Sequence, residues 1–416
     1  MKKKVYFKTF GCRTNLYDSQ VMMSSLKDYE ITQDESEADA IVINSCTVTN
    51  GADTHVRTYI SSVEKSKRDA KIFLTGCGAH TKGESLLKEK RVHGVFGQSE
   101  KQKIETLLQK EQPFYDPGDL SFIDESVVDE FVGKSRAFIK IQEGCNFRCS
   151  YCIIPYVRGD ARSMDETKIL EQVSRLAING FGEFILTGTN VGSYGQDKRS
   201  SLAELMKKMS QIRGVRRIRL GSVEPIQISD AFKEILDEPW LERHMHIALQ
   251  HTSPQMLKIM NRRNAYKQDR ELFEFLAQKG FAIGTDFITG HPGETKELWS
   301  EAMQNAAALP LTHLHAFTYS RRDGTPSATM KPEVNGKLAK ERLHDIERLV
   351  DEKNLLFRKS VTTPLEVLVE SHKDGVYHGL DQYFNKIIID SKEDLVGNWV
   401  TIENYEVRGD ANYAHI

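Results

Sequence analysis

The sequence lacks several features that would place the protein in a class at once. It has no run of about 18 apolar residues, which predicts no transmembrane helix and no membrane partner. Its start, MKKKVYFKTFGC, has no long apolar segment like that of a signal peptide, and we therefore expect a cytoplasmic protein. The formal net charge is only −2, so the overall charge does not indicate a nucleic-acid partner.

The composition is that of a globular protein with more than one domain. The 416 residues are 39% apolar and 28% charged, a length and balance that suit two or three domains. We expect a monomer. Only six cysteines are present, and in a reducing compartment they are more often metal ligands or nucleophiles than disulfide partners.

The first 110 residues alternate between strand-like and helix-like segments, which predicts an open parallel α/β sheet. Short apolar runs at 4–10, 40–44 and 71–75 are separated by helical patterns at 19–29 and 56–66. Cys12, Cys46 and Cys77 each follow one of the three runs by two residues. Ligands of open parallel sheets bind outside the carboxyl ends of the strands, so we expect the three thiols to meet at one edge.

Residues 111–134 are acidic and contain two prolines, which indicates a linker. The alternation then resumes over 135–357, where six strand-like runs predict a full or partial β/α barrel. Site residues of such barrels lie at the strand carboxyl ends. The runs cover residues 137–142, 184–188, 217–225, 246–250, 282–290 and 313–320.

Residues 358–416 contain strand-like segments with no helical pattern between them, which predicts a small β-barrel. Within 361–416, four Lys and Arg stand against ten Asp and Glu, a formal charge of −6. This segment is therefore acidic, whereas the remainder of the chain is slightly basic.

The segment EGCNFRCSYC carries Cys145, Cys149 and Cys152 within eight positions. A [4Fe–4S] cluster bound by three thiolates keeps one iron open, and the amino and carboxylate groups of S-adenosylmethionine are suitable chelators for it. A zinc site with a fourth ligand from elsewhere and an electron-transfer cluster are the alternatives. The C-x3-C-x2-C spacing is unfavourable for the first, and the absence of a fourth cysteine is unfavourable for the second.

The motifs together resemble the radical S-adenosylmethionine methylthiotransferases across nearly the whole chain. The resemblance rests on CNFRCSYCIIPYVRG at 145–159 and on shorter motifs before and after it. These are GCRTNLYDS (11–19), INSCTVTN (43–50), TGC (75–77), LTGTNVGSYG (186–195), GSVEP (221–225), TDFITGHPGET (285–295) and GTP (324–326).

The resemblance implies four segments and two clusters. Expected are an N-terminal domain over 1–113, a linker over 114–133, a radical core over 134–357 and a TRAM-like β-barrel over 358–416. Cys145, Cys149 and Cys152 would hold the radical cluster. The other three cysteines, Cys12, Cys46 and Cys77, would hold an auxiliary [4Fe–4S] cluster that carries an extra sulfur.

The family uses S-adenosylmethionine in two roles. One molecule methylates the cluster-bound sulfur, and another is reduced to a 5′-deoxyadenosyl radical that removes a hydrogen from the substrate carbon. A reducing electron donor is therefore an expected partner. The residues implied in cofactor binding are Tyr151, Thr187, Gly188, Asn190, Ser222, Glu224, Ile288 and Gly290, for which turn or cap roles are the alternative.

Arg158 and Arg162 are expected to contact a substrate phosphate or carboxylate, or else to form surface ion pairs. No catalytic residue beyond the two clusters is predicted. The segments 43–53 and 152–163 resemble the group that acts on threonylcarbamoyladenosine, which implies the tRNA anticodon stem-loop as partner. The alternatives are isopentenyladenosine in tRNA, an aspartate of a ribosomal protein, and a non-catalytic iron–sulfur protein that binds RNA.

The charge distribution leaves the substrate open, because the acidic C-terminal segment suits a basic protein partner better than RNA. Basic clusters at 213–219, 261–264 and 320–322 could contact RNA or be ordinary solvated surface. His251, His291 and His315 stand near strand ends, where they could be acid–base groups or structural residues.

Overall fold

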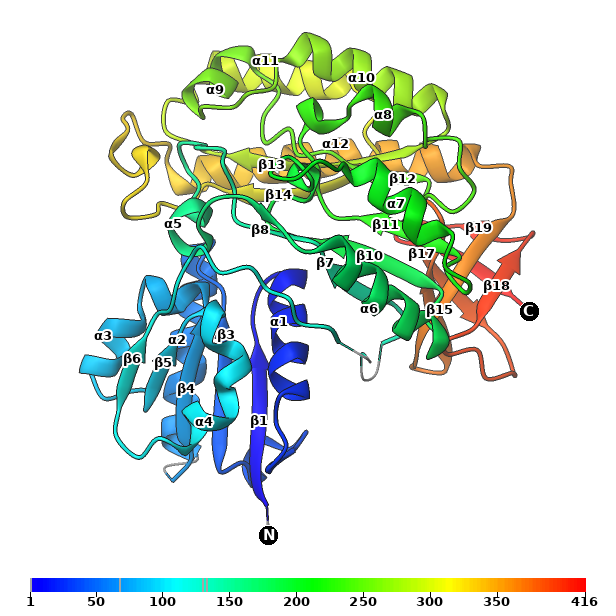
Figure 1. Ribbon diagram of the computed structural model, residues 1–416. Helices are drawn as coiled ribbons and strands as arrows, with labels where there is room; N and C mark the ends of the chain where they lie inside the picture. Colours follow the sequence, from blue (N-terminus) through cyan, green and yellow to red (C-terminus); the bar gives the residue numbers. More distant parts are fainter. Residues whose placement is uncertain (1, 67–68, 129–130, 132–133) are drawn as a thin grey trace.

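The computed structural model describes residues 2–66, 69–128, 131 and 134–416. Figure 1 shows an N-terminal α/β unit (blue to cyan) below a larger α/β core, with a C-terminal sheet (orange to red) at one end of the core strands. The predicted α/β architecture is confirmed. Of the helices in the part of the chain that is described, none has both the length and the hydropathy that a membrane crossing requires.

The N-terminal unit is a six-stranded parallel sheet in the order β2-β1-β3-β4-β5-β6. Its strands are β1 (Lys3–Thr9), β2 (Tyr29–Ile31), β3 (Ala40–Ser45), β4 (Lys71–Gly76), β5 (Gly94–Phe96) and β6 (Phe114–Asp116). Its helices are α1 (Arg13–Ser24), α2 (Asn50–Ser66), α3 (Gly83–Lys88) and α4 (Ile104–Gln109), with 3₁₀ turns η1 (Glu35–Glu37), η2 (Cys77–His80) and η3 (Gln98–Lys103).

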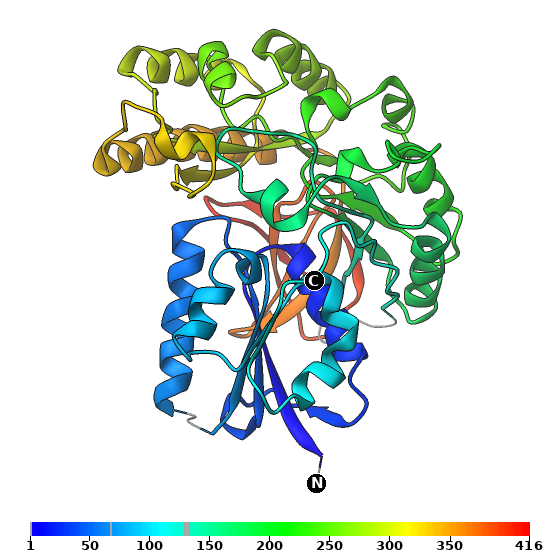
Figure 2. The same ribbon diagram turned by 60° about the vertical axis from the view of Figure 1, so that its left-hand side comes forward.

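Alternate residues of the central strands bury opposite faces of this sheet. Ile41 and Ile43 pack against α2, whereas Val42 packs against α1 and α4. Figure 2 shows α2 on one side of the sheet and α1 with α4 on the other. Because both faces are covered, the strands are continuous apolar runs, which is why the sequence pattern revealed β3 and β4.

Three short strands of this sheet, β2, β5 and β6, were not predicted by the sequence analysis. Strand β2 includes Tyr29, the last residue of a segment expected to be helical, and β6 lies in the expected linker. A three-residue strand has too few positions to show a period. The fit of β6 depends on Gly94, where a Cβ atom would come within 2.3 Å of the Phe114 ring.

The segment after β6 runs between the two α/β units and is packed against both. Val128 and Phe131 are buried in the core, and Asp124 is buried in an ion cluster. Residues 129, 130, 132 and 133 of the expected linker lie outside the described residues. The described part of the linker after β6, residues 117–128 and 131, is therefore packed against both units, and we call it the strap.

The core contains six parallel strands in two three-stranded sheets, ordered β11-β10-β7 and β12-β13-β14. Bridges from Ile218 to Leu241 and from Val223 to Ile247 connect the two sheets, which gives the predicted partial barrel. The strands are β7 (Ala137–Lys140), β10 (Glu183–Thr187), β11 (Arg217–Leu220), β12 (His244–His246), β13 (Ala282–Thr289) and β14 (His313–Thr318).

The helices of the core lie mostly on the outside of the strands, but α5 faces the N-terminal unit (Figure 1). They are α5 (Ile154–Arg158), α6 (Glu166–Ile178), α7 (Leu202–Ser210), α8 (Asp230–Lys233), α9 (Pro254–Ile259), α10 (Tyr266–Gln278), α11 (Lys296–Ala308) and α12 (Gly336–Ser360), with 3₁₀ turns η4 (Val191–Ser193), η5 (Pro225–Gln227) and η6 (Pro326–Thr329). A short hairpin of β8 (Gln142–Glu143) and β9 (Arg162–Ser163) closes the base of the cysteine loop.

The C-terminal unit is one curled six-stranded sheet, a half-barrel, in the order β18-β15-β16-β17-β20-β19. All neighbours are antiparallel except β17 and β20. The strands are β15 (Leu365–Lys373), β16 (Val376–Leu380), β17 (Lys386–Asp390), β18 (Trp399–Ile402), β19 (Glu406–Val407) and β20 (Asn412–His415).

Arginines of the basic cluster 213–219 attach this sheet to the core. Arg219 donates to Glu183, to Glu242 and to the carbonyl of Asp381, and Arg217 donates to the carbonyl of Glu366 at 2.7 Å. The guanidinium of Arg216 lies 4.4 Å from the ring of Trp399. Arg217 and Arg219 are buried, so neither is solvated surface or an RNA contact in this conformation.

Candidate active site

Cys12, Cys46 and Cys77 lie at the carboxyl ends of β1, β3 and β4, three neighbouring strands of the N-terminal sheet. Cys12 precedes α1, and Cys77 opens η2. Gly11 has a φ of +95°, and a Cβ atom there would come within 2.9 Å of the Cys46 sulfur. The chain before Cys12 therefore passes directly over Cys46, and the three thiols share one edge.

Cys145, Cys149 and Cys152 lie in the loop between β8 and α5. Three N–H groups point at their sulfur atoms: the Phe147 amide at 3.4 Å and the Asn190 side chain at 3.5 Å, both to Cys145, and Arg262 at 3.6 Å to Cys149. Hydrogen bonds of this kind stabilise the charge on a metal-bound thiolate.

Burial raises the pKa of several of these thiols. It raises that of Cys152 to about 12 and that of Cys46 to about 11, and it also raises those of Cys77 and Cys145. A thiol must lose its proton to bind a metal, so metal binding at either trio releases protons at neutral pH.

The two trios lie next to each other across the boundary between the N-terminal unit and the core. Cys77 packs against Ile153 and Val157, and Ile153 directly follows Cys152. In Figure 1, α5 lies above the ends of β3 and β4. The two loops that carry the cysteines are therefore in contact.

Arg158, at the end of α5, is buried next to Cys77. Its Nε atom donates to the Cys77 sulfur at 3.2 Å, and other guanidinium N–H groups reach Asp18 at 3.0 Å, Glu143 and Asn15. These partners are all protein groups, so the substrate contact expected for Arg158 stays a prediction. Arg162 donates to the carbonyl of Arg158 at 2.7 Å and is also largely enclosed.

A buried ion cluster continues from Arg158 through both units and the strap. Although burial opposes the shift, the surrounding cations hold the pKa of Asp18 well below its usual range. The cluster sets three carboxylates against three cations, and Arg162 lies at its edge, 3.5 Å from Glu143. Its members are Asp18 (α1), Lys101 (η3), Asp124 (strap), Lys140 (β7), Glu143 (β8) and Arg158 (α5).

Glu224, one of the expected cofactor residues, forms a two-pronged ion pair with Arg262, with one N–O distance of 2.9 Å. Burial raises the pKa of Glu224, and Arg262 opposes the shift. The same arginine donates to Cys149, so it joins the strand end to the cysteine loop. The sequence analysis placed Arg262 in a basic cluster at 261–264, but its side chain is only 1% exposed.

Asn190 is held on three sides. Its backbone N–H donates to the Gln142 side chain at 2.8 Å, its amide oxygen accepts from Gln227 at 2.8 Å, and its amide nitrogen reaches Cys145. Thr187 accepts the Ile141 amide at 3.0 Å, and a Cβ at Gly188 would come within 2.7 Å of the Gln142 carbonyl. Ser222, by contrast, is exposed.

Tyr151 and Ile288 pack in one apolar cluster with Met256 and Met260. Gly290 donates its amide to Glu294, and a Cβ atom there would come within 2.4 Å of the Ala339 Cβ. Cofactor contacts by the eight expected residues stay predictions.

Two of the three histidines named in the sequence analysis, His251 and His291, are buried. Both ring nitrogens of His291 are hydrogen-bonded, to the Pro292 carbonyl at 2.8 Å and to Ser327 at 2.7 Å, and burial lowers its pKa to about 4. Ser327 in turn bonds Ser150 inside the loop at 2.8 Å. His291 thus supports the loop. His251 accepts the Ser253 amide at 3.0 Å.

A cavity of about 620 Å³ lies between the N-terminal unit and the core. We call it the interdomain cavity. Its N-terminal wall includes Thr47, Asn50, Asp53, Arg57, His80 and Lys82. Its core wall includes Ile153, Tyr156, Arg321 and Arg322. Thr47 follows Cys46 and Ile153 follows Cys152, so the cavity adjoins both cysteine loops.

Sequence reasoning missed most of these cavity residues, because they come from segments up to about 270 positions apart that only the fold brings together. Arg322 donates to Asp53 at 2.6 Å and to the Val48 carbonyl at 3.2 Å. Its second terminal nitrogen and the Nε2 atom of His80 are buried with no hydrogen-bond partner among the described residues. The available signals were the basic cluster at 320–322, given as a candidate RNA contact, and the segments 43–53 and 152–163, given for their resemblance to the threonylcarbamoyladenosine group.

Comparison with known proteins agrees with this arrangement. Residues 4–97 match a family described as "Uncharacterized protein family UPF0004", and residues 139–306 match the radical SAM superfamily. A Helicobacter pylori (strain J99) protein named "Putative methylthiotransferase" is 53% identical and covers 99% of both chains. The chain belongs to the radical S-adenosylmethionine methylthiotransferases.

Other members of this methylthiotransferase family differ in the substrate that their names state. "Threonylcarbamoyladenosine tRNA methylthiotransferase MtaB" of Bacillus subtilis is 32% identical over 96% of this chain and 93% of that protein. "Ribosomal protein uS12 methylthiotransferase RimO" of Pelobacter propionicus is 33% identical over 90% of this chain and 87% of that protein.

The fold of this methylthiotransferase also occurs in a solved structure. The radical S-adenosylmethionine methyltransferase TsrM of Kitasatospora setae matches with a TM-score of 0.61 at 14% identity, over 79% of this chain and 74% of that chain. At this identity the likeness shows the fold.

The radical trio fits the [4Fe–4S] cluster that this superfamily implies. Its three cysteines are free, and their sulfur atoms do not all lie within 4.8 Å of one another. Thiolates that share one zinc ion at about 2.3 Å lie only about 3.8 Å apart, so the spacing suits a larger group. When bound, the cluster and S-adenosylmethionine together supply one-electron chemistry at an unreactive C–H bond.

Replacing Arg262 by lysine tests its role in joining Glu224 to the cysteine loop. A lysine ammonium cannot form the two-pronged pair and also reach Cys149. We expect Arg262→Lys to weaken S-adenosylmethionine binding about 10-fold or more, which is the loss of one charge-assisted hydrogen bond. Equilibrium dialysis with the anaerobically reconstituted protein measures this affinity.

Arg263→Lys is the matched control, because the Arg263 guanidinium lies 4.4 Å from the centre of the Phe147 ring and forms no hydrogen bond or ion pair with Glu224 among the described residues. Equal losses of affinity in the two variants would contradict the assigned role of Arg262.

Proposed function

We propose that this methylthiotransferase converts N6-threonylcarbamoyladenosine next to the tRNA anticodon to its 2-methylthio derivative. The observation that carries the proposal is the composition of the interdomain cavity. Its volume of about 620 Å³ lies in the range of small-molecule sites, roughly 300–1,000 Å³, and it adjoins both cysteine loops.

The two segments that resemble the threonylcarbamoyladenosine group face each other across this cavity. The first, CTVTNGAD at 46–53, contributes Thr47, Asn50 and Asp53. The second, CIIPYVRG at 152–159, contributes Ile153 and Tyr156. Residues that differ between substrate groups are expected where the substrate binds, and this common position therefore supports the assignment.

The charge of the cavity suits an acidic modification. Arg57, Lys82, Arg321 and Arg322 are opposed by only Asp53 and Asp323, and Asp53 is already paired with Arg322. The threonylcarbamoyl group carries a carboxylate, which arginine recognises through paired hydrogen bonds. An isopentenyl group has no charge and would offer these cations no anionic partner.

Both cysteine trios take part in the proposal. Cys12, Cys46 and Cys77 would hold the auxiliary [4Fe–4S] cluster, for which the buried Arg158 supplies a hydrogen bond and a compensating charge. An external one-electron reductant would serve the radical trio. The exposed Arg57 and Arg321 at the cavity could also meet phosphates of the anticodon stem-loop.

The nucleosides of tRNA test the substrate directly. In a strain that lacks the gene, we expect the 2-methylthio derivative of threonylcarbamoyladenosine to disappear and the unmethylthiolated nucleoside to rise, as measured by mass spectrometry of digested tRNA. Unchanged tRNA, together with loss from a ribosomal protein of the methylthio mass of about 46 Da (one sulfur, one carbon and two net hydrogens), would instead assign the aspartate substrate.

Removing a cavity cation tests how the carboxylate is recognised. We expect Arg321→Gln and Arg57→Gln each to raise KM for threonylcarbamoyladenosine-containing tRNA by about 10- to 100-fold, the value of one charge-assisted hydrogen bond. Formation of 5′-deoxyadenosine without tRNA should stay unchanged. Arg213→Gln is the control, because Arg213 is an exposed arginine outside the cavity; an equal effect there would point to general charge.

Iron analysis tests the auxiliary cluster. After anaerobic reconstitution we expect about eight irons per chain, and about four in the triple variant Cys12→Ala, Cys46→Ala, Cys77→Ala. The triple variant at Cys145, Cys149 and Cys152 should also lose about four. If the first variant kept as much iron as the wild type, Cys12, Cys46 and Cys77 would hold no cluster and the two-cluster proposal would fail.

A further inference from the structure

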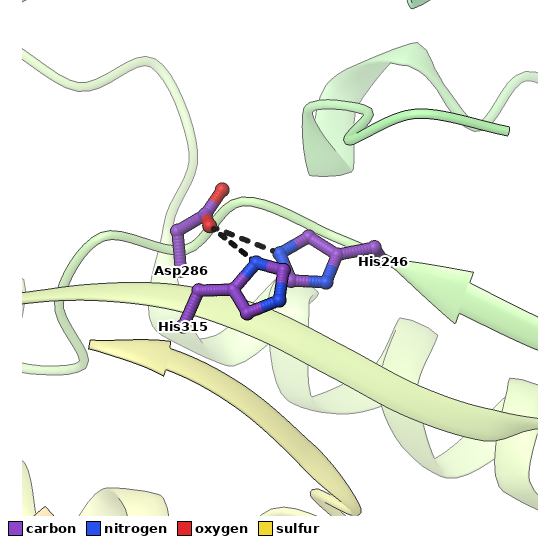
Figure 3. A group of neighbouring side chains, drawn as sticks. All are labelled: His246, Asp286 and His315. Carbon is purple, nitrogen blue, oxygen red and sulfur yellow. Dashed lines mark ion pairs between the residues drawn. The ribbon is translucent and has the colours of Figure 1, made fainter. Parts of the chain in front are cut away.

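Three side chains with metal-binding atoms meet inside the barrel, away from the six cysteines. His246, Asp286 and His315 come from β12, β13 and β14, and one ligand atom of each lies within 4.8 Å of the other two. Figure 3 shows a nitrogen of each histidine directed at the same oxygen of Asp286. These distances are 3.1 Å from His246 Nε2 and 3.6 Å from His315 Nδ1.

The strand register produces this meeting. Asp286 is directly paired with His315, and His246 is paired with Gly284, two residues before Asp286 on the same face of β13. Gly284 also gives the rings room, because a Cβ atom there would come within 2.7 Å of His246 Nδ1. The three groups are therefore placed by rigid parallel strands.

Hydrogen bonds within the protein do not satisfy all the polar atoms of these three side chains. The His246 side chain is only 8% exposed, and among the described residues its Nε2 atom has no hydrogen-bond partner of good geometry. Asp286 is largely buried and forms no ion pair with a lysine or arginine in the described part of the chain. A buried carboxylate without such a partner carries a large desolvation cost.

Two further histidines of the same strands lie next to the group. His244 and His313 lie just beyond the group, with His244 stacked on Phe384 of the C-terminal unit at 5.0 Å. His244 also lies against His246, and the rings of His246 and His315 are stacked at 4.7 Å, so four imidazoles meet in this part of the barrel.

We propose that His246, Asp286 and His315 bind one divalent transition-metal ion of the zinc type. Two imidazole nitrogens and a carboxylate oxygen are a common ligand set for such ions. Ligand atoms bound at about 2.1 Å lie about 3.0–3.5 Å apart, so the 3.1 and 3.6 Å separations need only small side-chain rotations.

The site lies close to the expected cofactor residue Glu224 and to its partner Arg262. Asp286 is close enough to Glu224 to contribute to its raised pKa, and the backbone of Ala248, two residues after His246, accepts a hydrogen bond from Arg262. The His315 side chain is 55% exposed, so the ion would keep open positions on the solvent side. A bound cation would neutralise Asp286 and fix three strands of the barrel.

Zinc retention by the reconstituted holoenzyme, in which the clusters occupy the thiols, tests the proposal. After dialysis against buffered zinc, we expect one zinc per chain by mass spectrometry. Zinc X-ray absorption should show only nitrogen and oxygen neighbours, with outer-shell scattering from two imidazoles. Asp286→Asn and His315→Gln should each weaken binding at least about 10- to 100-fold, at unchanged iron content.

His372→Gln is the control variant, because His372 is an exposed histidine of β15. If Asp286→Asn fails to fold, His315→Gln still decides, since that side chain is half exposed. Zinc absent from the dialysed holoenzyme, a sulfur shell around it, or equal retention in His315→Gln and the wild type would each overturn the site.

Discussion

The buried pairing of Arg158 with Asp18 and Glu143 is the interaction on which the rest of the arrangement depends. Asp18 belongs to the N-terminal sheet unit and Glu143 to the core, so one guanidinium spans the boundary between them. Breaking one partner out of such a buried pair typically costs about 3–5 kcal/mol, because an uncompensated charge remains. The same side chain touches the Cys77 sulfur, so the position of one cysteine trio depends directly on the junction.

The two trios are supported in parallel ways. Each has one buried arginine that pairs with a glutamate and donates to a cysteine sulfur: Arg158 with Glu143 and Cys77, and Arg262 with Glu224 and Cys149. A cation beside each set of thiolates offsets the negative charge that a cluster brings into a buried place. The interdomain cavity lies beside both sets, so the geometry gives a substrate access to the two loops at once.

Much of the fold followed from the sequence, and the reason is local. Strands β3 and β4 are continuous apolar runs with both faces buried, so their positions and the shared edge of Cys12, Cys46 and Cys77 could be predicted. The short strand β6 could not, because its pairing depends on the missing side chain of Gly94 in a segment 20 residues earlier. The contact of Arg158 with Cys77 could not be predicted either, because it also joins segments that are distant in the sequence. Arg217, Arg219 and Arg262 looked like surface cations, but carboxylates and carbonyls distant in the chain bury them, and no local pattern records that.

The contact between Arg158 and Cys77 forms late during synthesis of the chain. Arg158 follows Cys77 by 81 positions, and the α5 residues that pack on this thiol come from the same late segment. A nascent chain therefore exposes the complete thiol edge of its first sheet for the time needed to translate that stretch, on the order of 4 to 16 s at about 5–20 residues per second. Iron and sulfide delivered in that interval would meet an open edge, whereas later delivery would have to pass a finished domain boundary.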